Sequence, residues 1–117
     1  MELISRTQGT ALVLSVSGRI DHAHASAFEA ALAPHLLSCA ASGTALVLDF
    51  SGVDFISSVG LRVLMLAAKQ VKQQQGKLAM AALTPIVQEV FQVSRFNLVL
   101  KVFASVDQAV LALALAS

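Results

Sequence analysis

The sequence predicts a single α/β domain in which helices pack on a central mixed sheet, in the order β-β-α-β-α-β-α-β-α. Its 117 residues suffice for one hydrophobic core. Short apolar runs that are typical of buried strands alternate with stretches of helical spacing. After the first two strands, each strand is separated from the next by a helix, and such crossover connections produce parallel neighbours. We therefore expect one domain over residues 1–117.

Two strands joined by a tight turn open the chain. Residues 3–7 and 11–17 flank Gln8-Gly9-Thr10, and runs of this kind around a short glycine-containing connection form a β-hairpin. The second run alternates as a strand does, with Leu12, Leu14 and Val16 on one side and Val13, Ser15 and Ser17 on the other.

A helix is expected after the second strand, with Asp21 as its candidate N-cap, because a carboxylate there accepts a free backbone N–H. Pro34 lies within this helix and lacks the N–H that the preceding turn needs. We therefore expect a kink or two shorter helices, ending near Ser42-Gly43. The residues at helical intervals are Phe28, Ala31, Leu32, His35, Leu36 and Cys39.

The stretch from residue 45 to residue 61 runs from a buried strand through a polar connection onto a helix. Residues 45–50 are apolar except for one acid, and Ser51-Gly52 is expected to end that strand. The following helix runs to about Gln74, and Gly76 is its natural stop. Its expected apolar side consists of Leu61, Val63, Leu64, Leu66, Ala68 and Val71.

Two serines stand where that helix begins, and either Ser57 or Ser58 could be the N-cap, because a serine hydroxyl accepts a free N–H of the first turn. Gly60 costs roughly 1 kcal/mol of helix propensity relative to alanine, so close approach of another group should require it. A phosphate on Ser58 would be stabilised by the helix dipole, and Arg62 lies one turn further on.

The remaining elements are a strand, a helix, a strand and a closing helix. Residues 77–83 predict an interior strand, and Thr84-Pro85 predicts a cap followed by proline in the first turn. That helix has Val87, Val90 and Phe91 as its apolar face, ends at residues 94–97, and precedes a strand over residues 98–102. Ser105 to Gln108 match a capping box that opens a helix with Val106, Ala109, Val110 and Leu113.

The central stretch resembles the signature of STAS domains that act as anti-sigma factor antagonists. The matching residues are DFSGV at 49–53 and FISSVGL at 55–61, and the tail from 87–91 through 103–109 is also similar to that family. Ser57 stands where the family commonly has an aspartate, and Val59 stands where it often has serine or threonine. The resemblance implies a STAS-like fold over nearly the whole chain.

The resemblance also implies a function, that of an anti-sigma factor antagonist in a partner-switching network. The unphosphorylated chain would bind an anti-sigma factor that is also a serine kinase, and phosphorylation at Ser58, or less readily Ser57, would end the complex. The alternative is a non-phosphorylated STAS docking subunit of a transporter or other signalling complex. The partner-binding surface would comprise Asp21, Asp54, Ile56, Ser57, Ser58, Val59, Gly60 and Arg62.

Enzymatic and metal-binding functions have little support in the sequence, which predicts no catalytic residue, no cofactor and no metal. His22 and His24 are two residues apart on an expected helix, where they do not share a face, and no serine lies in a Gly-x-Ser-x-Gly elbow. The single cysteine, Cys39, excludes a disulfide within the chain and is expected to be a small buried side chain.

Charge and composition argue against direct binding of nucleic acid and against insertion into a membrane. The formal net charge is +1, and Trp and Tyr are absent. Hydrophobic residues make up 56% of the chain, yet no apolar run approaches the ~20 residues of a membrane span. A secretory signal is not visible at the N-terminus, so we expect a cytoplasmic protein, whose apolar surface allows a weak homodimer.

Overall fold

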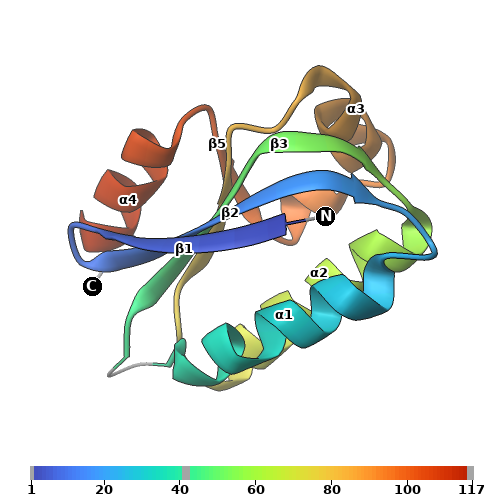
Figure 1. Cartoon of the computed structure of the whole chain (residues 1–117). Coiled ribbons are helices and arrows are strands. Elements are labelled where there is room, and N and C mark those ends of the chain that lie inside the picture. The colour runs from blue at the N-terminus through green and yellow to red at the C-terminus, as the bar shows by residue number, and fades with distance from the viewer. Residues whose placement is uncertain (1, 41–42, 116–117) are drawn as a thin grey trace.

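The computed structural model describes residues 2–40 and 43–115, and it confirms the predicted order of strands and helices (Figure 1). A short 3-10 helix, η1, is added before the last strand. The elements are β1 (Glu2–Gln8), β2 (Ala11–Ile20), α1 (Ala25–Ser38), β3 (Ala45–Ile56), α2 (Ser58–Gln73), β4 (Leu78–Ala81), α3 (Pro85–Val93), η1 (Phe96–Leu98), β5 (Lys101–Phe103) and α4 (Val106–Leu115).

The five strands form one mixed sheet in the order β1-β2-β3-β4-β5. β1 and β2 are antiparallel, and the other neighbouring pairs are parallel. Gln8 lies opposite Ala11, so the hairpin has a two-residue turn, and Gly9 at its first position has a φ of 60°. Glycine with positive φ at that position is the mark of a type II′ turn, which suits the twist of the strands. The predicted hairpin is confirmed.

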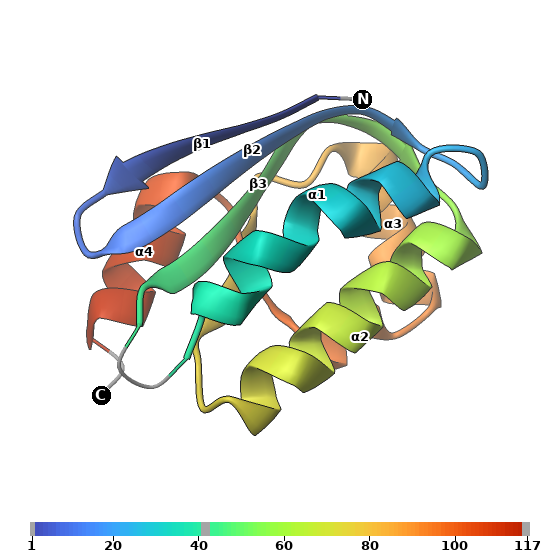
Figure 2. The same cartoon turned by 60° about the horizontal axis from the view of Figure 1, so that its bottom comes forward.

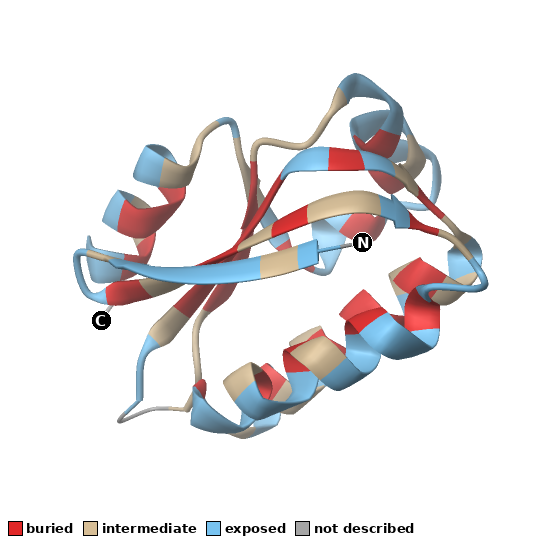
Figure 3. Cartoon of the chain, viewed as in Figure 1, coloured by how far each residue is buried: buried red, intermediate tan, exposed pale blue. Residues whose placement is uncertain are grey.

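Helices cover both faces of the sheet, but unequally. Figure 2 shows α1 and α2 side by side over one face, whereas α4 lies on the opposite face. Alternate strand residues point to the two faces, so the core divides into two clusters, and burial is concentrated on the inner sides of the elements (Figure 3). Large strand residues such as Leu14, Leu48 and Met80 face α1 and α2, whereas Val13, Val47, Ala79 and Ala81 face α4.

β3 is twice as long as the sequence pattern predicted. Ser51-Gly52 does not end it, because β3 carries one extra residue relative to β2 at two places and continues to Ile56. In the first irregularity Ser15 and Ser17 lie opposite Asp49 and Gly52, so three steps of β3 match two of β2. A Cβ at Gly52 would lie 2.9 Å from the Cβ of Ser17. Glycine is therefore required here for close packing of strands rather than for a turn.

The start of α1 differs from the prediction. The helix begins at Ala25 with His24 as its N-cap residue, so the expectation that Asp21 caps it directly is wrong. Asp21 instead caps the turn before the helix, where its Oδ1 accepts the backbone N–H of His24 at 3.0 Å. A carboxylate four residues before the helix thus shapes the connection between β2 and α1.

Pro34 lies inside one continuous helix rather than between two short ones. Pro34 and Ala30 are both exposed, so water can bond the Ala30 carbonyl that proline leaves without an N–H donor. The helix ends at Ser38, earlier than predicted, and Ser42 lies outside the described residues.

Turn geometry shortens β4 and β5. β4 ends at Ala81 because Ala82 has a φ of 58°, and β5 begins at Lys101 because Leu98 belongs to η1. The predicted start of α3 is confirmed, with Pro85 in the first turn after Thr84. The Thr84 hydroxyl does not cap α3 but donates to the Val53 carbonyl at 2.8 Å. The end of β3 is thereby attached to α3.

One of the two hydrogen bonds of the predicted capping box is present at the start of the closing helix. The backbone N–H of Gln108 donates to the Ser105 hydroxyl at 3.1 Å. Its neighbour Asp107 accepts a hydrogen bond from the Gln8 amide at 2.6 Å, which connects α4 to the hairpin. Within the described part of the chain, every helix is too short or too polar to cross a membrane.

Candidate functional site

The structure distinguishes the two serines at the start of α2. Ser57 is the N-cap residue, and its hydroxyl accepts the backbone N–H of Gly60 at 3.1 Å. Ser58 is the first residue of the helix and is exposed. Because the capping role belongs to Ser57, the Ser58 hydroxyl is available to a partner or to a modifying enzyme.

Gly60 lies where the ends of β2 and β3 approach the first turn of α2. A Cβ at this position would lie 2.8 Å from both Ile20 Cγ2 and Ile56 Cγ1. The backbone N–H of Ser57 donates to the Ile20 carbonyl at 2.9 Å, so the helix start is attached to β2. The expectation that close approach requires Gly60 is confirmed, and the geometry of the serine pair is fixed by the sheet.

The electrostatics of this helix start favour an added negative charge. No acidic side chain occupies the first turn of α2, and its N–H groups and dipole present partial positive charge. Arg62 lies one turn after Ser58 and is exposed, so both side chains stand on the same side of the helix. A phosphate on the Ser58 hydroxyl would be stabilised by the helix dipole and, one turn further on, by the Arg62 guanidinium.

Asp21, His24 and Arg19 form a polar group at the junction of β2 and α1, which we call the Asp21 cluster. Asp21 Oδ1 lies 2.6 Å from Nδ1 of His24, and its Oδ2 lies 3.9 Å from Nε of Arg19. The hydrogen bond from the His24 side chain lowers the pKa of the Asp21 carboxyl below its ordinary value, and partial burial opposes this effect. The Arg19 guanidinium lies 4.7 Å from the centre of the Phe55 ring.

The remaining predicted site residues divide into exposed and buried positions. Asp54 is exposed and is the extra residue of the second irregularity in β3, and Arg62 is exposed on α2. Val59 is half-buried against the core. Ile56 is only 2% exposed and Gly60 is buried, so these two shape the surface without offering a side chain to a partner. Contact of a partner with Ile56 stays a prediction, and in the free chain its side chain is covered.

Two apolar side chains extend the exposed face of α2. Met65 is 48% exposed and Leu66 is 45% exposed, three and four residues after Arg62. Leu66 was expected on the buried side, but the helix directs Val63, Leu64 and Ala67 inward instead. We call Ser58, Arg62, Met65 and Leu66 the α2 surface.

The sequence reasoning missed the contact between Arg19 and Phe55. Phe55 opens the FISSVGL stretch, but nothing in that stretch points to Arg19, and the two become neighbours only because β2 and β3 are parallel with Arg19 opposite Phe55. This contact could have been predicted only from the register of the two strands.

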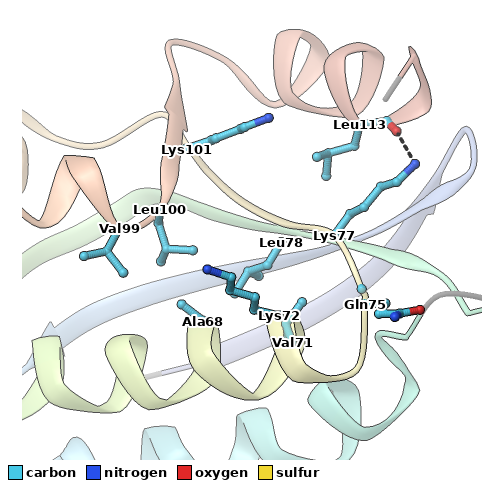
Figure 4. A pocket seen from close by; sticks show the side chains of 11 residues that line it. Ala68, Val71, Lys72, Gln75, Lys77, Leu78, Val99, Leu100, Lys101 and Leu113 are labelled. Carbon is cyan, nitrogen blue, oxygen red and sulfur yellow. Dashed lines mark hydrogen bonds between the residues drawn. The ribbon is translucent and has the colours of Figure 1, made fainter. Parts of the chain in front are cut away.

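A cavity of about 480 Å³ lies at the far end of α2, between the C-terminal turns of α2 and α4 (Figure 4). Lys72, Lys77 and Lys101 surround it, with apolar side chains from α2, from β4 and from Val99 and Leu100 beneath them. Lys77 Nζ donates to the Leu113 carbonyl at 3.3 Å. The negative ends of two helix dipoles meet here, and positive side chains nearby are stabilised by them.

Known proteins match this chain in sequence and in fold. The STAS domain family matches residues 2–109. A Bordetella bronchiseptica protein named as the anti-sigma factor antagonist BtrV is 41% identical over 85 residues, which are 73% of this chain and 71% of BtrV. The crystal structure of an anti-sigma factor antagonist from Mycobacterium paratuberculosis superposes with a TM-score of 0.85, at 26% identity, over 97% of this chain and 93% of the other.

A third similarity concerns the fold alone. The Bacillus cell fate determinant SpoIIAA, in its phosphorylated form, superposes with a TM-score of 0.67 at 16% identity, over 95% of this chain and 98% of its own. The names of these relatives describe regulators and refer to no reaction that they catalyse. The chain belongs to the STAS domain family, and it is of the anti-sigma factor antagonist type.

Proposed function

We propose that this chain binds an anti-sigma factor that is also a serine kinase, and that phosphorylation of Ser58 by that kinase ends the complex. The binding surface would consist of the α2 surface together with Asp54, Val59 and the Asp21 cluster. Both partners would act in the cytoplasm. The relatives support the binding of an anti-sigma factor, because their names describe anti-sigma factor antagonists.

The observation that carries the proposal is that Ser57 caps α2 whereas Ser58 is exposed and does not. Ser57 caps the helix, so a chemical change at Ser58 leaves the capping hydrogen bond to Gly60 in place. The Ser58 hydroxyl is exposed at the first helical position and needs no unfolding to enter a kinase active site. The phosphorylated form of SpoIIAA supports a modification of this kind on the same fold.

The release step follows from the charge of the phosphate. In the transfer, the Ser58 oxygen attacks the γ-phosphorus of ATP, loses its proton to the kinase, and ADP leaves. The new group adds about −1.5 to −2 charges at neutral pH. Within the free chain this charge is stabilised by the start of α2, whereas inside a closely packed interface it costs desolvation and repels acidic groups of the partner.

The apolar part of the α2 surface supports a docking role for this helix. Met65 and Leu66 follow Arg62 on the exposed side, and Met and Arg are enriched in protein interfaces. A partner covering them would also cover Ser58, because all four side chains lie on one side of the helix within little more than two turns.

The first test is mass spectrometry of the chain isolated from its own cells, both intact and as peptides. We expect one phosphoryl group on the peptide that contains residues 57 and 58. The Ser57→Ala variant should keep this modification, and the Ser58→Ala variant should lose it. A chain that stays unmodified under every growth condition would instead favour a constitutive docking subunit.

The second test measures binding by calorimetry to an anti-sigma factor with a serine kinase domain from the same genome. We expect Ser58→Ala to bind as the unmodified chain does and Ser58→Asp to bind at least about tenfold more weakly. A Gln92→Glu variant, which adds the same single negative charge on the exposed side of α3, is the control for a general effect of charge. Equal binding by Ser58→Asp and wild type would exclude the switch.

A further inference from the structure

The strand β1 is one of the two edges of the sheet, and β5 is the other. β1 pairs with β2 alone, and its residues are mostly exposed along its length (Figure 3). An exposed edge strand presents unpaired N–H and C=O groups to any other strand that can align with it. The seven residues of β1 therefore form a surface on which a further strand could be added.

We propose that two copies of this chain associate through their β1 strands, paired antiparallel about a two-fold axis with Ile4 opposite Ile4. Such an interface is isologous, because each copy contributes the same strand. The two five-stranded sheets would then form one continuous sheet.

The charge pattern of β1 selects this pairing. Glu2 and Arg6 are its only charged residues, have opposite signs, and stand two positions on either side of Ile4. In an antiparallel pair centred on Ile4, Glu2 of each copy lies opposite Arg6 of the other, so the interface contains two opposite-charge pairs. Opposite charges directly across a strand pair are stabilising, whereas like charges are destabilising.

Neighbouring registers lose this complementarity. A shift that centres the pair on Ser5 places Glu2 opposite Gln8 and Ile4 opposite Arg6. A shift that centres it on Leu3 places Glu2 opposite Ile4. Among registers that keep the same sheet faces together, only the one centred on Ile4 directly pairs both charges and matches the apolar side chains.

The positions of Ile4 and Arg6 in the single chain are compatible with such a contact. Ile4 is 62% exposed on the sheet, where it has no function in the core of its own chain. Arg6 Nη1 donates to the Ser15 hydroxyl at 2.7 Å, and that hydroxyl donates to Asp49 Oδ2 at 3.1 Å. This chain of hydrogen bonds holds Arg6 along the sheet and leaves further guanidinium N–H donors for a carboxylate.

The proposal is tested by sedimentation velocity over two orders of magnitude in protein concentration. We expect a reversible monomer–dimer equilibrium for the wild type. Each of Glu2→Lys and Arg6→Glu replaces two attractive pairs by two repulsive ones, so each should weaken association about tenfold or more. The double variant Glu2→Lys/Arg6→Glu restores opposite charges across the pair and should regain most of the association.

Two controls keep this result specific. Glu29→Lys makes the same change of net charge as Glu2→Lys but lies on α1, and should associate as the wild type does. Circular dichroism and thermal unfolding of each variant verify that the monomer is folded. A monomeric wild type, single variants that associate normally, or a folded double variant that stays monomeric would each overturn the proposal.

The register has its own test, based on disulfide formation. Ile4→Cys places two thiols directly opposite each other across the two-fold axis and should give a covalent dimer on mild oxidation. Ser5→Cys is the matched control, because Ser5 lies opposite Leu3 in the proposed register. Crosslinking of Ser5→Cys in preference to Ile4→Cys would overturn the pairing centred on Ile4.

Discussion

The backbone N–H of Ser57 donates to the carbonyl oxygen of Ile20 at 2.9 Å, which attaches the start of α2 to the last residue of β2. The same isoleucine limits the space at Gly60. The position of Ser58 therefore depends on the sheet as well as on its own helix, and changes at this junction should be measurable in both stability and binding.

Gly60→Ala should destabilise the fold. The added Cβ would lie 2.8 Å from two buried isoleucine side chains, and overpacking of this kind costs about 1–3 kcal/mol. The helix propensity of alanine returns about 1 kcal/mol, so we expect a net loss of about 1 kcal/mol in the free energy of unfolding. Urea unfolding measures this loss, and a variant more stable than the wild type would contradict the packing argument.

Ser57→Ala and Ser58→Ala should differ in stability although the residues are adjacent. Loss of the hydrogen bond between the Ser57 hydroxyl and the Gly60 N–H should cost about 1 kcal/mol of unfolding free energy. Ser58 is exposed and caps nothing, so its replacement should change stability by less than about 0.5 kcal/mol. Equal losses in urea unfolding would show that both hydroxyls contribute to the cap.

Asp21→Asn should change how the free energy of unfolding depends on pH in the acid range. The hydrogen bond from the His24 side chain lowers the pKa of Asp21 below 3.8 in the folded chain, so the native state favours the ionised carboxyl. Its stabilising contribution is present above the unfolded pKa and is lost as the pH falls through the folded value. We expect the difference in unfolding free energy between wild type and variant to shrink toward low pH.

The control for this titration is Asp54→Asn, which removes an exposed carboxylate from the neighbouring strand end. Urea unfolding at a series of pH values measures both variants against the wild type. A gap between wild type and Asp21→Asn that stays constant down to about pH 2 would mean that the Asp21 carboxyl does not titrate differently in the two states.

The Cys39 thiol should be unreactive in the native protein. It is 1% exposed and donates to the Lys77 carbonyl at 3.1 Å, and burial raises its pKa. We expect its reaction with a disulfide reagent to be on the order of 100-fold slower in the native state than in urea. A Leu37→Cys variant, changed at a position that is 71% exposed, should add a fast phase. A fast native reaction of the wild type would contradict the burial of Cys39.

The sequence predicted elements whose signals are local. The hairpin at Gly9, the proline start of α3 and the helical spacing after Ser58 each depend on a few adjacent residues, and all three occur in the structure. The close approach of another group to Gly60 was predicted from the cost of glycine in a helix alone. The structure identifies Ile20 as one such group.

Features that depend on distant neighbours could not be predicted in this way. Ser51-Gly52 has the composition of a strand end, but β2 lies alongside and continues the pairing through two irregularities. Leu98 fits a strand by composition, yet the positive φ of 59° at Arg95 turns the chain into η1 first. The burial of Ile56 and the contact of Arg19 with Phe55 depend on strand register in the same way.

The two unequal core clusters separate the chain into parts that can vary independently. α4 packs against small strand residues such as Ala79 and Ala81, on the opposite side of the sheet from α1 and α2. Substitutions in α4 therefore adjust to alanine-lined space without altering the side chains that support Ser58. A change of packing under α4 should therefore alter the stability of the chain while the surface around Ser58 keeps its shape.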